Sequence, residues 1–205
     1  MRVPKLSALF GREKPVERKA IRSPDGLEVG DYVEFGFLPI PDLSNKRFAV
    51  AQINHVDYGH GAQRSLVLAS GETTVGLSYE AGDQGRALIV TKLLPRPDVE
   101  QLFDMDRFAT VFDTGLASAL PLIGRPEHLD PWLDGSGYEE RVDAVPARFR
   151  TGTDLQWSTF DFYELEGMSD AGFTLEIEVY DDDTEIYACR ALRPDAVEKY
   201  WPSGA

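Results

Sequence analysis

The feature that most constrains the fold is a strict alternation near the C-terminus. Apolar side chains there take turns with polar or amphipathic ones, in the order Phe173, Thr174, Leu175, Glu176, Ile177, Glu178, Val179 and Tyr180. Successive side chains of a β-strand point to opposite faces, so this period of two predicts a strand with one dry and one wet face. The turn at 181–184 and the returning segment 185–192 predict a hairpin.

Short apolar, β-branched segments separated by glycine-containing turns recur through the first half of the chain. They predict strands at 32–35, 48–56, 65–69, 74–79 and 86–93. Regular short strands with polar turns favour an antiparallel meander that curls into a small barrel or sandwich. Prolines follow at 95 and 97, and a short helix is expected at 98–103.

These patterns predict a mostly β (α+β) fold: two small antiparallel meander- or barrel-like sheets with a few short helices. The expected divisions are a basic flexible arm (1–25), an N-terminal meander (26–95), a helix-and-loop connector (96–144) and a C-terminal antiparallel sheet (145–205). The last of these is expected to end in a short helix that starts at Asp195. The patterns leave open whether the strand clusters form one body or two domains.

Charge is unevenly distributed along the chain. The net charge is -14, but residues 1–22 alone carry +5, so the remainder carries -19. An acidic body repels the phosphate backbone, which argues against a nucleic-acid partner. The three tryptophans, at 132, 157 and 201, are not aligned with basic residues in the sequence, so no platform for stacked bases is expected.

The basic arm has two interpretations. It is a disordered tail in free solution, or it is an anchor that makes weak peripheral contact with a membrane or binds a protein partner. In the second interpretation apolar side chains enter the headgroup layer and basic ones meet anionic lipid. The residues concerned are Arg2, Lys5, Leu6, Leu9, Phe10 and Arg12.

The cellular setting is constrained by absences in the sequence. Cys189 is the single cysteine, so no disulfide can form within the chain. No apolar run approaches the roughly 20 residues of a membrane helix, and residues 1–12 lack the apolar core of a signal peptide. We therefore expect a cytoplasmic protein, with contact to the inner membrane limited to the arm.

Two local motifs suggest chemistry. Asp113-Thr114-Gly115 resembles the Asp-Thr-Gly turn of aspartic proteases, but Leu116 departs from that pattern and the tripeptide is also an ordinary turn. His55, Asp57 and His60 cluster around a turn, yet zinc needs three or four ligands and no cysteine or further histidine lies nearby. We expect Asp57 to accept hydrogen bonds within the turn instead.

Other candidates are weaker still. The run 181–183 is too short for a calcium loop and is expected to be a solvated turn. Cys189 has no neighbouring base and is expected to be buried. His128 stands alone. No phosphate loop, dinucleotide fingerprint or nucleophile elbow is present. The sequence therefore predicts no catalytic, metal or cofactor-binding residue and no cofactor.

Four segments together resemble the YjfK-like family of uncharacterised bacterial proteins, a domain of unknown function. They are 27–31, 51–68 around Asp57-Tyr58-Gly59, 107–113, and 175–180 through Arg193-Pro194. The resemblance implies a bacterial cytosolic protein, encoded beside a membrane-remodelling coiled coil, a small membrane protein and an enzyme resembling glutathionylspermidine synthase. It implies an accessory role in a membrane-stress or polyamine-linked system and transfers no catalytic residue.

Three functions remain open. The first is a non-catalytic adaptor that binds a protein partner, itself membrane-associated. The second is a binder of a small cationic, polyamine-like ligand, held by acidic side chains beside Tyr32, Tyr58, Tyr79 or Tyr163. The third is an enzyme that uses paired carboxylates. The missing catalytic motifs, the basic arm and the acidic body favour the first, and the other two are its alternatives.

Overall fold

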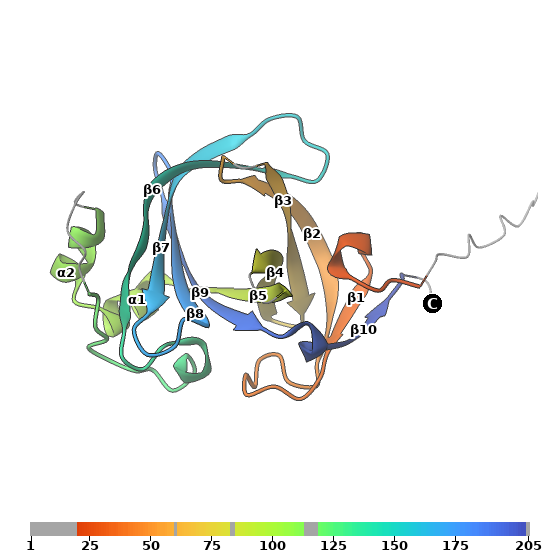
Figure 1. Ribbon diagram of the computed structural model, residues 1–205, viewed down its shortest axis with the longest axis horizontal. Coiled ribbons are helices and arrows are strands. Elements are labelled where there is room, and N and C mark those ends of the chain that lie inside the picture. The colour runs from red at the N-terminus through yellow and green to blue at the C-terminus, as the bar shows by residue number, and fades with distance from the viewer. Residues whose placement is uncertain (1–19, 60, 83–84, 113–118, 204–205) are drawn as a thin grey trace, which may run out of the picture.

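The computed structural model describes residues 20–59, 61–82, 85–112 and 119–203. Within these ranges the chain forms one ten-stranded antiparallel sheet in the order β10-β1-β2-β3-β4-β5-β9-β8-β7-β6. A further pairing between β2 and β6 joins the sheet to itself. The eight strands β2-β3-β4-β5-β9-β8-β7-β6 therefore form a closed barrel. Figure 1 shows this ring, with the helices and the remaining strands outside it.

The strands are β1 (Tyr32–Phe35), β2 (Arg47–Asp57), β3 (Ala62–Ser70), β4 (Thr73–Gly82), β5 (Gly85–Leu93), β6 (Tyr138–Thr151), β7 (Ser158–Gly167), β8 (Phe173–Val179), β9 (Thr184–Leu192) and β10 (Val197–Trp201). The α-helices are α1 (Arg96–Leu102) and α2 (Met105–Ala109), and the 3-10 turns are η1 (Pro24–Gly26), η2 (Thr110–Phe112), η3 (Asp130–Trp132) and η4 (Pro194–Ala196).

The predicted strand-rich antiparallel fold is confirmed, but the prediction of two small sheets is wrong. β5 pairs with β9 from Leu88↔Leu192 to Leu93↔Tyr187, which joins the two strand clusters into one wall. β2 pairs with β6 from Asn54↔Thr151 to Asp57↔Arg148, which closes it. Both pairings join segments about a hundred residues apart, and alternation within a strand says nothing about which distant strand becomes its neighbour.

The barrel has its polar side chains inside and its apolar ones outside. On β3, for example, Ser65 and Val67 line the lumen, whereas Leu66 and Leu68 are buried on the outer face. The predicted dry face of β8 likewise lies outside, where Leu175 is fully buried. The main hydrophobic core therefore lies between the barrel wall and the segments that cover it.

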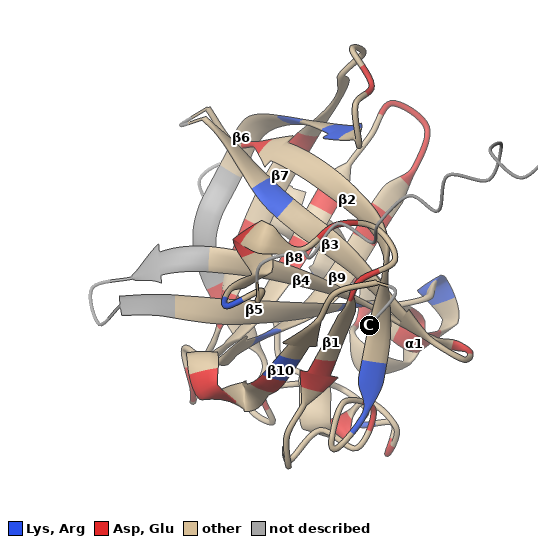
Figure 2. Ribbon diagram, turned by 90° about the vertical axis from the view of Figure 1, so that its right-hand side faces the viewer, with Lys and Arg blue, Asp and Glu red and all other residues tan. Residues whose placement is uncertain are grey.

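The cover comes from segments on two sides of the ring. β1, β10 and η1 lie outside β2, and α1 and α2 lie outside β6 and β7 (Figure 1). Their buried side chains include Phe35, Leu102 and Phe108, which join the same core as the outer face of the wall. Trp132 of η3 is buried in that core as well. Acidic residues are more numerous than basic ones along the described ribbon (Figure 2).

A bulge in β2 determines which of its side chains face the lumen. Val50 pairs with Leu68 but Gln52 pairs with Val67, so Ala51 is an extra residue. The extra residue reverses which face the following side chains occupy. Val50 is therefore buried in the outer core, whereas Gln52 and Asn54 line the lumen.

The expected C-terminal helix is wrong beyond its first turn. η4 covers Pro194–Ala196, and the following residues form strand β10, which pairs with β1 from Tyr32↔Trp201 to Phe35↔Val197. Tyr200 and Trp201 are aromatic and suit an extended, half-buried strand, and pairing with β1 overrides the weak helical pattern. Residues 107–112 are helical, in α2 and η2.

The close approach of β4 to β5 gives a first prediction. A Cβ atom at Gly76 would overlap with Oγ1 of Thr91, its partner on β5, although the backbone of Gly76 is not left-handed. Gly76→Ala is expected to lower the free energy of unfolding by about 1–3 kcal/mol through overpacking, measured by urea denaturation. Thr91→Ala in the same chain should restore most of the loss. Simple additivity of the two substitutions would contradict the proposed clash.

Candidate binding cavity inside the barrel

The lumen contains a cavity of about 660 Å³. Its lining comes from all eight barrel strands, which identifies it as the interior of the ring and not a surface groove. A cavity of this size is in the range of sites that bind small molecules.

Four glutamates form one wall of the cavity. Glu164 of β7 pairs in register with Glu176 of β8, and Glu178 of β8 pairs with Glu185 of β9. All four line the cavity. Side chains directly opposite on antiparallel strands have Cβ atoms about 4.5–5.5 Å apart, so the wall carries two facing pairs of carboxylates.

The opposite wall is neutral and polar. In a closed ring of eight strands, β3 lies across from β8 and β4 lies across from β7. These strands, with β2 and β5, contribute hydroxyl and amide side chains to the cavity: Gln52, Asn54, Gln63, Ser65, Thr74, Ser78 and Thr91. The two walls therefore present carboxylates on one side and neutral hydrogen-bonding groups on the other.

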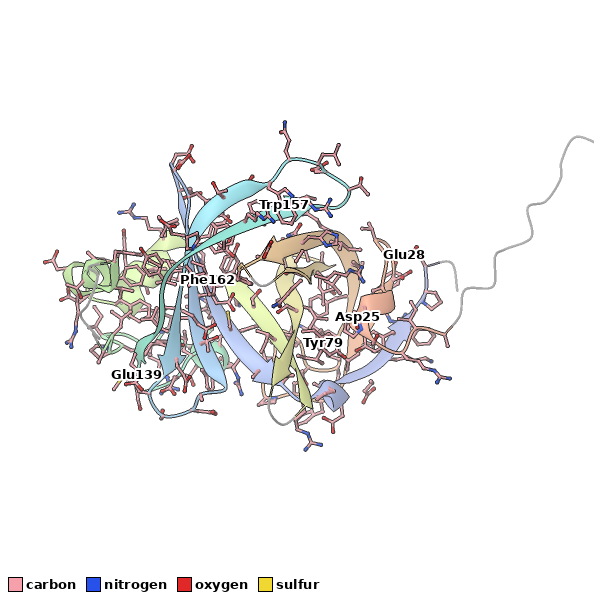
Figure 3. All side chains as sticks on the ribbon, turned by 45° about the horizontal axis from the view of Figure 1, so that its top comes forward. Asp25, Glu28, Tyr79, Glu139, Trp157 and Phe162 are labelled. Atoms are coloured by element: carbon pink, nitrogen blue, oxygen red, sulfur yellow. The ribbon has the colours of Figure 1, made fainter. Side chains whose placement is uncertain are left out.

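Aromatic rings gather beside the carboxylates. Tyr58 packs against Phe162, with ring centroids 4.7 Å apart, and Tyr180 packs against Phe160 at 5.3 Å and Phe149 at 6.0 Å. Figure 3 shows Phe162 on the inner side of the wall. These rings belong to a second hydrophobic cluster, separate from the outer core, so one part of the lumen is apolar.

The tyrosine hydroxyls bind the carboxylates directly. Tyr180 donates to Oε2 of Glu178 at 2.5 Å, and Tyr187 donates to Oε2 of Glu185 at 2.5 Å. Burial, and then hydrogen bonding to these glutamates, raises the pKa of both phenols. The phenols therefore remain protonated and act as donors at neutral pH.

Burial also affects the neighbouring groups. It raises the pKa of Tyr58, and the charges of Glu176 and Glu178 raise it further. Burial raises the pKa of Glu178, the hydrogen bond from Tyr180 opposes this, and the charge of Glu185 adds to it. Tyr58 lines the same cavity as these carboxylates.

Basic counter-charge is scarce in this cavity. Of the described residues that line it, Arg64 is the one Lys or Arg. Its guanidinium donates to the carbonyl oxygens of Pro24, Asp25 and Leu27, at the outer segment η1. Its charge is therefore engaged at the outside of the barrel.

Of the four tyrosines considered from the sequence, Tyr58 lines the cavity. Tyr79 and Tyr163 pack with the outer core, and Tyr32 is 40% exposed on β1. Figure 3 shows Tyr79 beside Asp25, away from Phe162. From the sequence, no binding role was expected for Tyr180, Tyr187 or any particular glutamate, although the alternation around residue 178 was the available signal.

The cluster at His55 and Asp57 lies on the outer face of β2. Asp57 Oδ1 accepts hydrogen bonds from the backbone N–H groups of Gly59 and Gly61, which confirms the expected turn role, and Oδ2 accepts from Arg148 at 2.9 Å. His55 lies between Arg64 and Arg150 across the strands. Its pKa is lowered by burial and by the two arginines. Within the described ranges no group of His, Cys, Asp and Glu could hold a metal ion.

The remaining candidates are placed as follows. Residues 113–115 and 60, and the arm residues Arg2, Lys5, Leu6, Leu9, Phe10 and Arg12, lie outside the described residues. The attached end of the predicted arm packs on the body through Ile21 and the buried Pro24. Cys189 is buried as expected. In the part of the chain that the structure describes, no helix has the length and hydropathy to cross a membrane.

The tryptophans are not aligned with basic residues in the sequence, but the fold brings basic side chains onto them. Arg148 and Arg150 lie over Trp157, and Lys199 lies over Trp201. These contacts form across strands and through a loop, which linear spacing does not reveal. Because Arg148 also binds Asp57, its charge is compensated locally.

In comparisons with known proteins, no family model, no curated protein and no solved structure matches this chain. The resemblance to the YjfK-like family stays a prediction. We therefore argue function from the cavity and its chemistry.

Burial of the phenols gives a second prediction. Tyr58, Tyr138, Tyr180, Tyr187 and Tyr200 all have raised pKa values, with burial as the main cause. When the native protein is titrated with base, at most three of the eight tyrosines should ionise near the ordinary pKa of about 10. Tyrosinate absorbance measures this, and in denaturant all eight should titrate together. Reversible ionisation of six or more in the folded protein would contradict the enclosed lumen.

Proposed function

We propose that the barrel binds a small organic cation in its lumen. The observation that carries this proposal is the cavity of about 660 Å³ with four glutamates on one wall. Arg64, the one Lys or Arg among the described lining residues, donates to carbonyl groups at η1. In a partly desolvated site a carboxylate attracts a cation more strongly than in water. Tyrosine and phenylalanine faces beside the carboxylates add cation–π attraction.

The spacing of the carboxylates favours an amine with two charges. Glu176 and Glu178 are two residues apart on β8 and share the luminal face. Two residues of a strand span roughly 6.6 Å. A linear diamine with a four-carbon chain has its ammonium groups at a comparable separation, so each could meet one pair of carboxylates. The amide and hydroxyl groups of the opposite wall can accept the remaining N–H donors.

The proposal is tested by calorimetric titration with 1,4-diaminobutane. The wild-type protein should bind the diamine more tightly than butylamine and should not bind the uncharged 1,4-butanediol. Glu176→Gln should weaken the diamine by roughly 10- to 100-fold, as expected for loss of a hydrogen bond to a charged group.

A matched control separates the site from bulk charge. Glu127→Gln changes the net charge equally at an exposed position outside the barrel and should leave the affinity unchanged. If both substitutions weaken binding equally, or if the diol binds as well as the diamine, binding of a cation in the lumen is wrong.

A second candidate is an enzyme that uses paired carboxylates, and the facing pair Glu178 and Glu185 favours it. Two neighbouring carboxyl groups can serve as general acid and general base. Chromogenic esters and glycosides provide a direct assay. Turnover by the wild type that Glu178→Gln abolishes would support this candidate, and equal rates for the two proteins would remove it.

The adaptor role inferred from the basic arm is a separate hypothesis. Its residues lie outside the described ranges, so it draws no support from the cavity. It is compatible with cation binding, because the arm and the lumen are different parts of the chain.

A further inference from the structure

Glu178 and Glu185 are two carboxyl groups that face each other inside the barrel. They are a register pair across the β8–β9 hairpin, and both line the cavity. Each accepts a hydrogen bond from the tyrosine two residues further along its own strand, Tyr180 and Tyr187, at 2.5 Å. Among the described side chains, these tyrosines are the hydrogen-bond partners of the two carboxylates.

Among the described lining residues, none that faces this pair brings a positive charge to it. Glu176 of β8 and Glu164 of β7 are further carboxyl groups of the same wall, and β7 places Phe162 opposite Glu178. Tyr58 follows β2 and is neutral, and β5 places Leu93 opposite Tyr187.

The described lining residues of the other strands are also uncharged apart from Arg64, which binds carbonyl groups at η1. Like charges directly opposite each other are destabilising, and more so in an enclosed site. A proton is then the simplest counter-charge for the empty cavity.

We propose that the Glu178–Glu185 pair shares one proton when the lumen is empty and releases it when a cation binds. The step is balanced: the proton leaves one carboxyl group for solvent, and the ligand's ammonium group takes its place as counter-charge to the two carboxylates. Cation affinity then falls as the solution becomes more acidic, because ligand and proton compete for one pair. This inference rests on the proposed function but makes a claim about the empty protein as well.

The raised pKa of Glu178 determines how the stability of the empty protein depends on pH. Burial, with the charge of Glu185, raises the pKa of Glu178 above its ordinary value of 4.5 in spite of the opposing hydrogen bond from Tyr180. Between the unfolded and folded values the native state therefore holds a proton that the unfolded state has released. Stability from this group is present at low pH and is lost as the pH rises through that window.

The first experiment needs no ligand. Urea unfolding is measured between about pH 5 and pH 8 for the wild type, Glu178→Gln and the control Glu127→Gln. Relative to the wild type, Glu178→Gln should gain stability as the pH rises, by up to tenfold in the folded-to-unfolded ratio per pH unit. Glu127→Gln should run parallel to the wild type. A parallel curve for Glu178→Gln overturns the shared proton, and Glu185→Gln gives the same comparison if that variant does not fold.

The second experiment measures the released proton. Calorimetry with 1,4-diaminobutane in two buffers of different ionisation enthalpy should show release of up to one proton per ligand in the wild type and none in Glu178→Gln. Binding without proton release overturns the inference and leaves the proposed function standing. No binding, together with the expected pH dependence of stability, removes the proposed function and retains the proton pair.

Discussion

Closure of the sheet is the constraint on which the rest of this structure depends. The β5–β9 pairing carries the first strand cluster into the second, and the β2–β6 pairing returns the second to the first. Once the ring is closed, one face of every barrel strand points into a bounded volume. A polar side chain on that face then meets other protein groups instead of bulk water, which strengthens its electrostatic interactions.

The same closure turns the apolar face outward and makes a cover necessary. Segments between regular strands provide it, and polar contacts hold them in place. Asp42, in the loop before β2, accepts hydrogen bonds from Lys92 of β5 at 2.5 Å and from Trp132 of η3 at 3.1 Å. Trp132 is fully buried, so a segment that looks like a connector in the sequence forms part of the core.

The lumen combines features that oppose one another energetically. Facing glutamates repel, but tyrosine hydroxyls donate to two of them, and the burial that raises the pKa of Glu178 also favours a bound proton or cation. Such an arrangement costs stability unless something positive is present. That cost is the physical reason why we propose the cavity as a binding site.

Much of the fold was predictable because alternation and turn residues act locally. Strands at 32–35, 48–56, 65–69, 74–79 and 86–93, and the hairpin of β8 and β9, appear close to where their patterns placed them. The cavity residues were harder to predict from the sequence. Glu176, Glu178 and Tyr180 were identified as a wet face, but their partners Glu164, Glu185 and Tyr187 come from other strands whose register is a tertiary property.

The sequence by itself determined which side chains share a face, because a strand's period of two is a property of the covalent chain. It also determined the acidic balance and the buried character of Cys189. Only the tertiary structure decided that the polar face is the inside of a barrel and the apolar face its outside. That choice depends on which distant strands pair and which loops cover them, and such contacts form only when the whole chain is folded.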